Sequence, residues 1–243
     1  MGSGPDDIWV GYGDGEQSRA QLGSTTNRAL LVPWDGRGWS LDSTLDPNVA
    51  AMGDVADIWG KGPSDVWAIG GTALHWDGKR WSSAPALSSM DLSDGARSVW
   101  SSGPADVWVG AEAGVRHWDG VSWSEPLSSS NGSGFIVRGT GPTDVWAVTS
   151  GDGTSATAWH WNGACGQSFV VPGLLSATDV AAVSPTDAWA VGDGPNLYRD
   201  AAAHWGGKAW TPSYAGTNAF GGKLWSDGQQ VWAIAGGGLI PHP

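Results

Sequence analysis

The chain has 243 residues, with 24 acidic against 12 basic side chains and a formal net charge of -12. This balance argues against a nucleic-acid partner, because phosphate contacts need Lys and Arg, and against an anionic membrane surface. No apolar run is long enough to span a bilayer, so we expect no membrane insertion. Cys165 is the single cysteine, which excludes an internal disulfide.

A repeat of about 40 residues runs along the chain, which is the signature of propellers and solenoids. Its first element, Asp-Ile-Trp or a variant, places tryptophans at Trp9, Trp67, Trp108, Trp146, Trp189 and Trp232. Its second element, Trp-Asp-Gly or a variant, begins at Trp34, Trp76, Trp118, Trp161 and Trp205. We therefore predict a single domain over residues 1–243 with six sequence repeats, the first and last incomplete.

Each repeat is interpreted as four short strands, named a to d. The first repeat begins at strand b. In the second repeat, strand a is Asp57–Trp59, strand b is Val66–Ile69, strand c is Ala73–Trp76 and strand d begins at Trp81. The Asp-Gly turn between strands c and d is a strong hairpin signal. The lack of helical periodicity indicates an all-β fold, and radial repetition of four-stranded units indicates a β-propeller.

The number of blades has three interpretations. The first is six blades with a split closing blade, since the chain ends near a sixth strand c at Leu239–Ile240. Counting in the order c-d-a-b gives five complete blades, from Leu30 to Ala235. A longer parent with seven or more blades is the third. The first residues match internal Gly-Pro segments, so we expect a leader to be absent from this sequence.

The repeated aromatic and histidine residues are interpreted as packing. Tryptophans at matching strand positions fill the wedge between twisted blades. His75, His117, His160 and His204 precede the strand c tryptophan. A metal-binding ring would need these side chains to converge, so a His–Asp hydrogen bond within each blade is favoured. The Asp ahead of strand b is the candidate acceptor for the indole or for backbone N–H groups.

The run from strand b to strand c resembles the Trp-rich repeats of tectonin and tachylectin-type propeller lectins. The turn Asp77-Gly78-Lys79-Arg80-Trp81 is also similar to the Asp-box of sialidase-like propellers, without its spacer and its Ser and Thr. The resemblance implies a secreted or cell-surface bacterial binding module whose partner is a glycan or cell-surface polysaccharide. A protein-interaction or structural scaffold is the alternative, and a propeller hydrolase is a third.

Loop lengths indicate which face carries the function. The a–b and c–d turns are short, whereas the other face has long b–c loops (Gly11 to Arg28, Thr149 to Thr157, Gly192 to Ala202) and long d–a loops (Asp42 to Asp54, Ala84 to Ala96, Thr211 to Gly221). Variable loops on a rigid scaffold concentrate binding residues. The candidate ligand-binding residues on this face are Tyr12, Asp14, Glu16, Arg19, Asp152, Trp159, Asp193, Tyr198, Arg199 and Asp200. The alternative is that they are solvated loop residues, with Trp159 packing at an edge.

No catalytic constellation is recognised, because the arginines are scattered and the glutamates are only Glu16, Glu112 and Glu125. We therefore expect a binding protein rather than an enzyme. We expect no cofactor, with calcium as an alternative because the Asp-Gly loops offer oxygen ligands. Asn131-Gly132-Ser133 is a formal glycosylation sequon that is interpreted as a turn.

Overall fold

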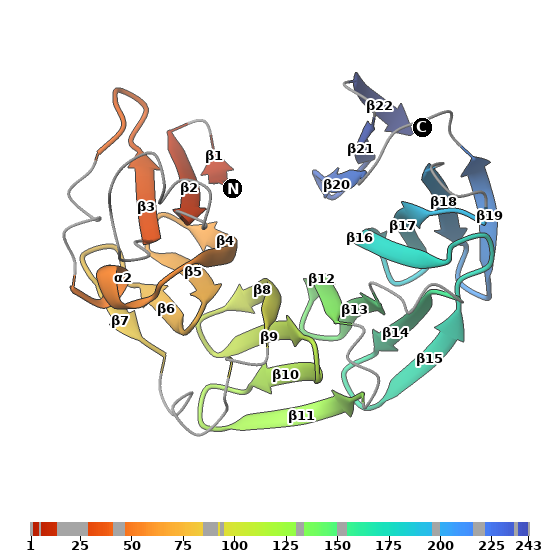
Figure 1. Cartoon of the computed structure of the whole chain (residues 1–243), viewed down its shortest axis with the longest axis horizontal. Helices are drawn as coiled ribbons and strands as arrows, with labels where there is room; N and C mark the ends of the chain where they lie inside the picture. The colour runs from red at the N-terminus through yellow and green to blue at the C-terminus, as the bar shows by residue number, and fades with distance from the viewer. Residues whose placement is uncertain are drawn as a thin grey trace, which may run out of the picture. The chain divides into compact units, whose positions relative to one another are not determined.

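The computed structural model describes residues 2–4, 6–13, 29–40, 47–84, 92, 95–129, 134–149, 155–195, 200–215, 222–235 and 238–242 (Figure 1). The chain divides into two compact units. Unit 1 contains Met1–Ala111 and Arg116–Ser124, and unit 2 contains Glu112–Val115 and Glu125–Pro243. The boundary between the units therefore passes through the third of the six antiparallel sheets that the described residues form.

The first three sheets are formed by residues 2–128. The first sheet contains β1 (Gly2–Gly4), β2 (Asp7–Gly13) and β3 (Ala29–Trp34). The short helix α2 (Pro47–Ala51) precedes the second sheet, which contains β4 (Val55–Gly62), β5 (Asp65–Gly70), β6 (Ala73–Trp76) and β7 (Trp81–Ser83). The third contains β8 (Ala96–Gly103), β9 (Asp106–Ala111), β10 (Gly114–Trp118) and β11 (Trp123–Ser128).

The last three sheets all belong to unit 2. The fourth sheet contains β12 (Phe135–Gly141), β13 (Asp144–Thr149), β14 (Thr157–Trp161) and β15 (Gly166–Val170). The fifth contains β16 (Ser176–Ser184), β17 (Asp187–Asp193), β18 (Asp200–Trp205) and β19 (Trp210–Ala215). The sixth contains β20 (Lys223–Ser226), β21 (Val231–Ala235) and β22 (Gly238–His242).

The sheets follow the a-b-c-d order that the repeat predicts, with one difference. The first repeat does not begin at strand b, because β1 pairs with β2 and supplies the strand a position. The sequence signal was missed because Gly2–Gly4 carries no apolar side chain. Strand d of the first sheet is reduced, among the described residues, to a single bridge between Trp34 and Trp39.

Each sheet has two aromatic faces, because successive residues of a strand point to opposite sides. In the second sheet, one face carries the strand b tryptophan Trp67, which packs in a cluster with Val107 and Trp118 of the third sheet. The other face carries Trp81, which packs with Trp9 of the first sheet. At two sheet pairs, the strand b tryptophan contacts the strand c and strand d tryptophans of the next sheet: Trp9 contacts Trp76 and Trp81, and Trp146 contacts Trp205 and Trp210.

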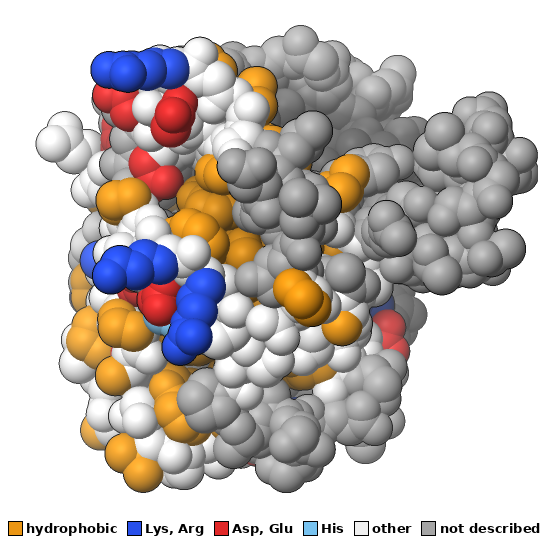
Figure 2. All heavy atoms as spheres, turned by 90° about the vertical axis from the view of Figure 1, so that its left-hand side faces the viewer, with side chains coloured by type: hydrophobic (Ala, Val, Ile, Leu, Met, Phe, Trp, Pro, Cys, Tyr) orange, Lys and Arg blue, Asp and Glu red, His pale blue; other side chains and the backbone are white. Residues whose placement is uncertain are grey.

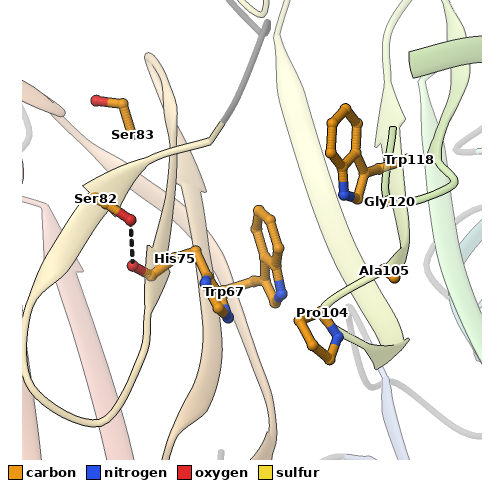
Figure 3. Close-up of a pocket in the computed structure, with 8 residues that line it drawn as sticks. All are labelled: Trp67, His75, Ser82, Ser83, Pro104, Ala105, Trp118 and Gly120. Atoms are coloured by element: carbon orange, nitrogen blue, oxygen red, sulfur yellow. Dashed lines mark hydrogen bonds between the residues drawn. The ribbon is translucent and has the colours of Figure 1, made fainter. Parts of the chain in front are cut away.

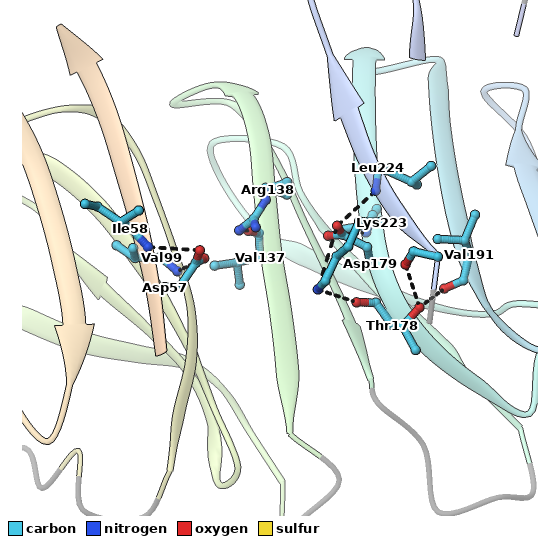
Figure 4. A network of polar contacts seen from close by, with 12 residues as sticks. Asp57, Ile58, Val99, Val137, Arg138, Thr178, Asp179, Val191, Lys223 and Leu224 are labelled. Atoms are coloured by element: carbon cyan, nitrogen blue, oxygen red, sulfur yellow. Dashed lines mark hydrogen bonds and ion pairs between the residues drawn. The ribbon is translucent and has the colours of Figure 1, made fainter. Parts of the chain in front are cut away.

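Aspartates on strand a, the first strand of a sheet, connect neighbouring sheets within each unit (Figure 4). In unit 1, the Asp57 carboxylate accepts hydrogen bonds from its own neighbour Ile58 N at 2.9 Å and from Val99 N of β8 at 3.0 Å. In unit 2, Asp179 accepts from Val180 N at 3.0 Å and from Leu224 N of β20 at 3.1 Å. Each carboxylate satisfies backbone donors of two inner strands that lie in different sheets.

The turns between strands c and d have one side-chain geometry. The Asp77 Oδ1 atom accepts hydrogen bonds from Lys79 N at 2.8 Å and Arg80 N at 2.9 Å, and Gly78 has φ of 90°. The same arrangement recurs in the c–d turns around Asp35, Asp119 and Asn162, and also around Asp227 in the turn between β20 and β21. The positive φ explains why glycine follows the aspartate or asparagine. In the described part of the chain, no helix has the length and apolarity needed to cross a membrane.

Candidate functional site

A module of tryptophan, histidine and aspartate recurs in four sheets and builds the wall of the candidate site. In the second sheet, the His75 ring lies over Trp67 with ring centroids 4.5 Å apart, and His75 Nε2 is 2.8 Å from Asp65 Oδ1. The same pairs are His117–Asp106, His160–Asp144 and His204–Asp187, at 2.7, 2.7 and 2.9 Å. The predicted His–Asp hydrogen bond in each of these blades is confirmed.

A hollow of about 290 Å³ lies within unit 1, where the second and third sheets meet (Figure 3). Its lining residues are Trp67, His75, Ser82, Ser83, Pro104, Ala105, Trp118 and Gly120. Ser82 and Ser83 belong to strand β7, and Pro104 and Ala105 form the turn between β8 and β9. The hollow therefore opens at the end of the third sheet that carries its short turns, and not at the end where the long loops lie.

Among the described residues, the indole N–H groups of Trp67 and Trp118 have no hydrogen-bond acceptor, but only that of Trp67 is buried. The Trp67 side chain is 2% exposed, and its Nε1 atom is buried without a partner. Trp76 and Trp205 each donate Nε1–H to a turn proline carbonyl at 3.1 Å, but Trp118 makes no such bond to Pro104. In Figure 3 both indole nitrogens lie on the Pro104 side of their rings. An indole N–H can only donate, so the buried Trp67 N–H lacks the only kind of partner that it can use.

The hollow lies where the aromatic packing between sheets is interrupted. Trp9 contacts Trp76 and Trp81 of the following sheet, with ring centroids 5.4 and 5.3 Å apart. In unit 2, Trp146 contacts Trp205 and Trp210 at 5.3 and 5.4 Å. Among the described residues, Trp67 has no aromatic ring partner other than His75. The space that tryptophan rings fill elsewhere is open beside Trp67.

The surface around the unit 1 turns is mixed in charge. Figure 2 shows basic side chains beside acidic ones, with hydrophobic side chains between them. Backbone N–H groups of Arg80 and Lys79 hold the pKa of the Asp77 carboxyl below its ordinary value, and hydrogen bonds to Ser122 and Val121 do the same for the pKa of Asp119. Burial raises the pKa of Asp106, but hydrogen bonds from His117, Ser102 and Trp108 outweigh it and the net shift is downward. These carboxylates are ionised acceptors at neutral pH, already engaged by the protein.

Most of the residues predicted from the long loops lie outside the described part of the chain, namely Asp14, Glu16, Arg19, Asp152, Tyr198 and Arg199. Tyr12 lies in β2 opposite Leu30. Asp193 and Asp200 pair at the ends of β17 and β18, and Asp193 accepts a hydrogen bond from Ser176 Oγ at 3.0 Å. The assignment of these residues to a ligand site stays a prediction.

Trp159 differs from the expectation that it presents a free ring to a ligand. Its side chain is 5% exposed and stacks on Trp161 with ring centroids 6.1 Å apart. A Cβ atom at Gly166 would fall on the Trp159 indole. Gly166 stands at the strand d position where Trp81 and Trp210 stand in their sheets. Trp159 therefore fills the space that this missing tryptophan leaves, which is a packing role.

The residues that line the hollow were missed because each belongs to the repeat. Trp67, His75 and Trp118 were interpreted as packing residues, and the short turns as scaffold. One signal could have found the hollow: Ser82, Ser83 and Ala84 are small, whereas the strand d region of another sheet carries larger side chains such as Gln167 and Phe169.

Among the described residues, no group of three or more His, Cys, Asp or Glu side chains could hold a metal ion.

No family model matches this chain, and no curated protein matches it. It is similar in structure to the extracellular domain of a protein assigned to the one component systems of B. thetaiotaomicron, with a TM-score of 0.65 and 12% identity. That match covers 100% of this chain, which spans 31% of the other. The chain is also similar to the SapL1 lectin in complex with alpha methyl fucoside (TM-score 0.54, 12% identity, 89% of this chain and 88% of the lectin).

A third similar structure is the fucose-specific lectin from Aleuria aurantia, with a TM-score of 0.53 and 11% identity over 98% of this chain and 95% of the lectin. Identities this low establish the fold and nothing finer. The chain is a tryptophan-rich, nearly all-β propeller, and its described residues form six antiparallel sheets.

Proposed function

We propose that this chain is a carbohydrate-binding module and that the hollow beside Trp67 and Trp118 receives a sugar. The observation that carries this proposal is a hollow lined by the rings of Trp67 and Trp118 and by Ser82 and Ser83, beside a buried Trp67 N–H that has no acceptor. A buried donor without an acceptor costs about 1–3 kcal/mol, and a ligand oxygen that accepts the hydrogen bond recovers it. The carbon skeleton of a sugar suits the apolar walls, and its hydroxyl groups suit Ser82 and Ser83.

The size of the hollow supports a small ligand. Its volume of about 290 Å³ is at the lower end of the range of ligand pockets, which begins near 300 Å³. Two structural neighbours are lectins: SapL1 was solved in complex with alpha methyl fucoside, and the Aleuria aurantia lectin is fucose-specific. We extend the sugar class, and not the individual sugar, from those proteins to this chain. A secreted or cell-surface location and a cell-surface polysaccharide as natural partner are part of the same proposal.

A glycan array of the purified chain, with calcium and with a chelator, tests the proposal. A saturable hit supports it, and dependence on calcium would direct attention to the loops with oxygen ligands. If no glycan binds, the proposal is wrong, and a protein-interaction scaffold, for which the next screen is a search for a protein partner, takes its place.

Two tryptophan variants locate the site. Trp67→Phe keeps an aromatic ring and removes the N–H, so we expect affinity for the array hit to fall about fivefold to tenfold, corresponding to about 1 kcal/mol. The matched control is Trp146→Phe, because Trp146 Nε1 is also buried without an acceptor but packs against Trp205 and Trp210. Equal losses in both variants would remove the site from the hollow.

A further inference from the structure

Ala84 and Phe169 occupy the same position in their sheets. Phe169 lies on β15 and Ala84 directly follows β7. Each comes two residues after the residue that pairs with the stacked histidine, which is His75 in the second sheet and His160 in the fourth. Both side chains therefore point to the face that carries the strand b tryptophan. The two sheets differ at this position by the volume of a phenyl ring.

Phe169 fills the space between two sheets of unit 2. Its ring centroid is 4.6 Å from that of Trp205 in the fifth sheet and 6.3 Å from that of Trp146 in the fourth. Trp205 and Trp146 are the equivalents of Trp118 and Trp67, the two tryptophans at the hollow of unit 1. The phenyl ring thus contacts both aromatic walls of the space that corresponds to the hollow.

Ala84 places only a methyl group where the fourth sheet has the Phe169 ring. It is 7% exposed and belongs to the same buried cluster as Trp67 and Trp118. Its methyl group is too short to reach between these tryptophans in the way that the Phe169 ring does. Interiors are close-packed, so a missing ring at one position leaves a void unless the neighbours move in. The hollow of about 290 Å³ is lined by Trp67 and Trp118 and by Ser82 and Ser83, which directly precede Ala84.

We infer that the side chain at this outer-strand position decides whether two neighbouring sheets carry a ligand hollow. Ala84 keeps the site beside Trp67 open, and Phe169 is a plug that closes the equivalent site beside Trp146. That the hollow holds a ligand rests on the proposed function. The opening and closing of the hollows is argued from side-chain packing alone. It predicts that one substitution removes the site between the second and third sheets and that a different one creates a site between the fourth and fifth sheets.

The test uses Ala84→Phe and Phe169→Ala in the full chain. Crystals of the wild type and both variants are soaked in methyl α-L-fucoside and in the methyl glycosides of glucose and galactose, and stoichiometry is measured by titration calorimetry with the sugar that binds. We expect one site in the wild type, a loss of at least about tenfold in affinity in Ala84→Phe, and a second site beside Trp146 in Phe169→Ala.

Controls separate packing from general damage. Ala84→Gly keeps the hollow open and should bind like the wild type, and Val170→Ala changes the exposed neighbour of Phe169 and should add no site. If Ala84→Phe does not fold, Ala84→Leu replaces it, and Phe169→Val replaces Phe169→Ala on the same ground. Binding that survives a folded Ala84→Phe, or a folded Phe169→Ala with one site, overturns the inference and leaves the proposed function standing.

If the wild type binds none of these sugars and the glycan array is blank, the proposed function fails, while the variant structures still decide the inference. A hollow that closes in Ala84→Phe and one that opens in Phe169→Ala would support the packing rule. Unchanged hollows in both variants would overturn it.

Discussion

The imidazole of His160 lies almost flat on the indole of Trp146, with ring centroids 4.1 Å apart and an interplanar angle of 13°. The same histidine holds Asp144 at 2.7 Å, and the Asp144 side chain is only 3% exposed. The His204–Asp187 pair has the same chemistry, but its side chains are 35% and 45% exposed. The module thus recurs with one geometry in two very different degrees of burial.

This difference predicts unequal effects of histidine removal. His160→Ala leaves the buried Asp144 carboxylate with the Thr140 hydroxyl but without its histidine partner, so we expect a loss of about 2–3 kcal/mol in the free energy of unfolding. His204→Ala leaves a solvated carboxylate, and we expect a loss of about 1 kcal/mol or less. Urea denaturation at neutral pH measures both. Equal losses would mean that ring stacking, and not the carboxylate, dominates the module.

Acid should weaken unit 1 through Asp106. Its pKa is lower in the folded chain than in the unfolded chain, because hydrogen bonds from His117, Ser102 and Trp108 outweigh its burial. A lowered pKa contributes stability that is complete above the unfolded value, about 3.9, and is lost as pH falls through the folded value. The stability difference between the wild type and Asp106→Asn should therefore shrink as pH falls from 6 to about 3. Denaturation curves across that range check this, and a difference independent of pH would contradict it.

The repeat predicted the sheets well because each strand position carries its own physical demand. Trp67, Trp108 and Trp146 recur since the wedge between sheets must be filled, and Gly78 recurs because the turn needs a positive φ. The first inner strand escaped prediction, because Gly2–Gly4 has no side chain to mark a buried face.

The candidate site could not be predicted in the same way. A hollow depends on a side chain that is small at a repeated position, and the tryptophan and histidine residues that line it recur in most repeats. Trp118 and Trp76 occupy the same position of the repeat in the sequence. Only the structure shows that the Trp76 indole N–H donates to the Pro63 carbonyl while Trp118 lacks the matching hydrogen bond. Trp159 was singled out as an irregular residue, but its irregularity compensates for Gly166.

The aspartates on strand a, Asp57 and Asp179, should contribute more to the free energy of unfolding than aspartates at the sheet ends. Asp179 is 2% exposed and accepts from Val180 N and Leu224 N, so Asp179→Ala leaves two backbone donors without their acceptor. We expect a loss of about 2 kcal/mol and faster amide hydrogen exchange at Leu224. The control is Asp193→Ala, whose side chain is exposed and bonded to Ser176 Oγ, with an expected change of about 0.5 kcal/mol or less. Unchanged exchange at Leu224 would show that Asp179 does not connect the two sheets in solution.

Trp159 and Gly166 should behave as one packing unit. Gly166→Trp restores the strand d tryptophan of the other sheets but collides with the Trp159 ring, and overpacking of this kind costs about 1–3 kcal/mol or more. Trp159→Leu removes most of that ring and opens a cavity, with an expected loss of about 3 kcal/mol. The double variant recreates the Leu74 and Trp81 pair of the second sheet, in which both side chains are fully buried. Its loss should therefore be smaller than the sum of the two single losses by at least about 1 kcal/mol in a double-mutant cycle. Additive losses would mean that the two positions do not share one space, and Trp159 would regain its place among the candidate ligand-binding residues.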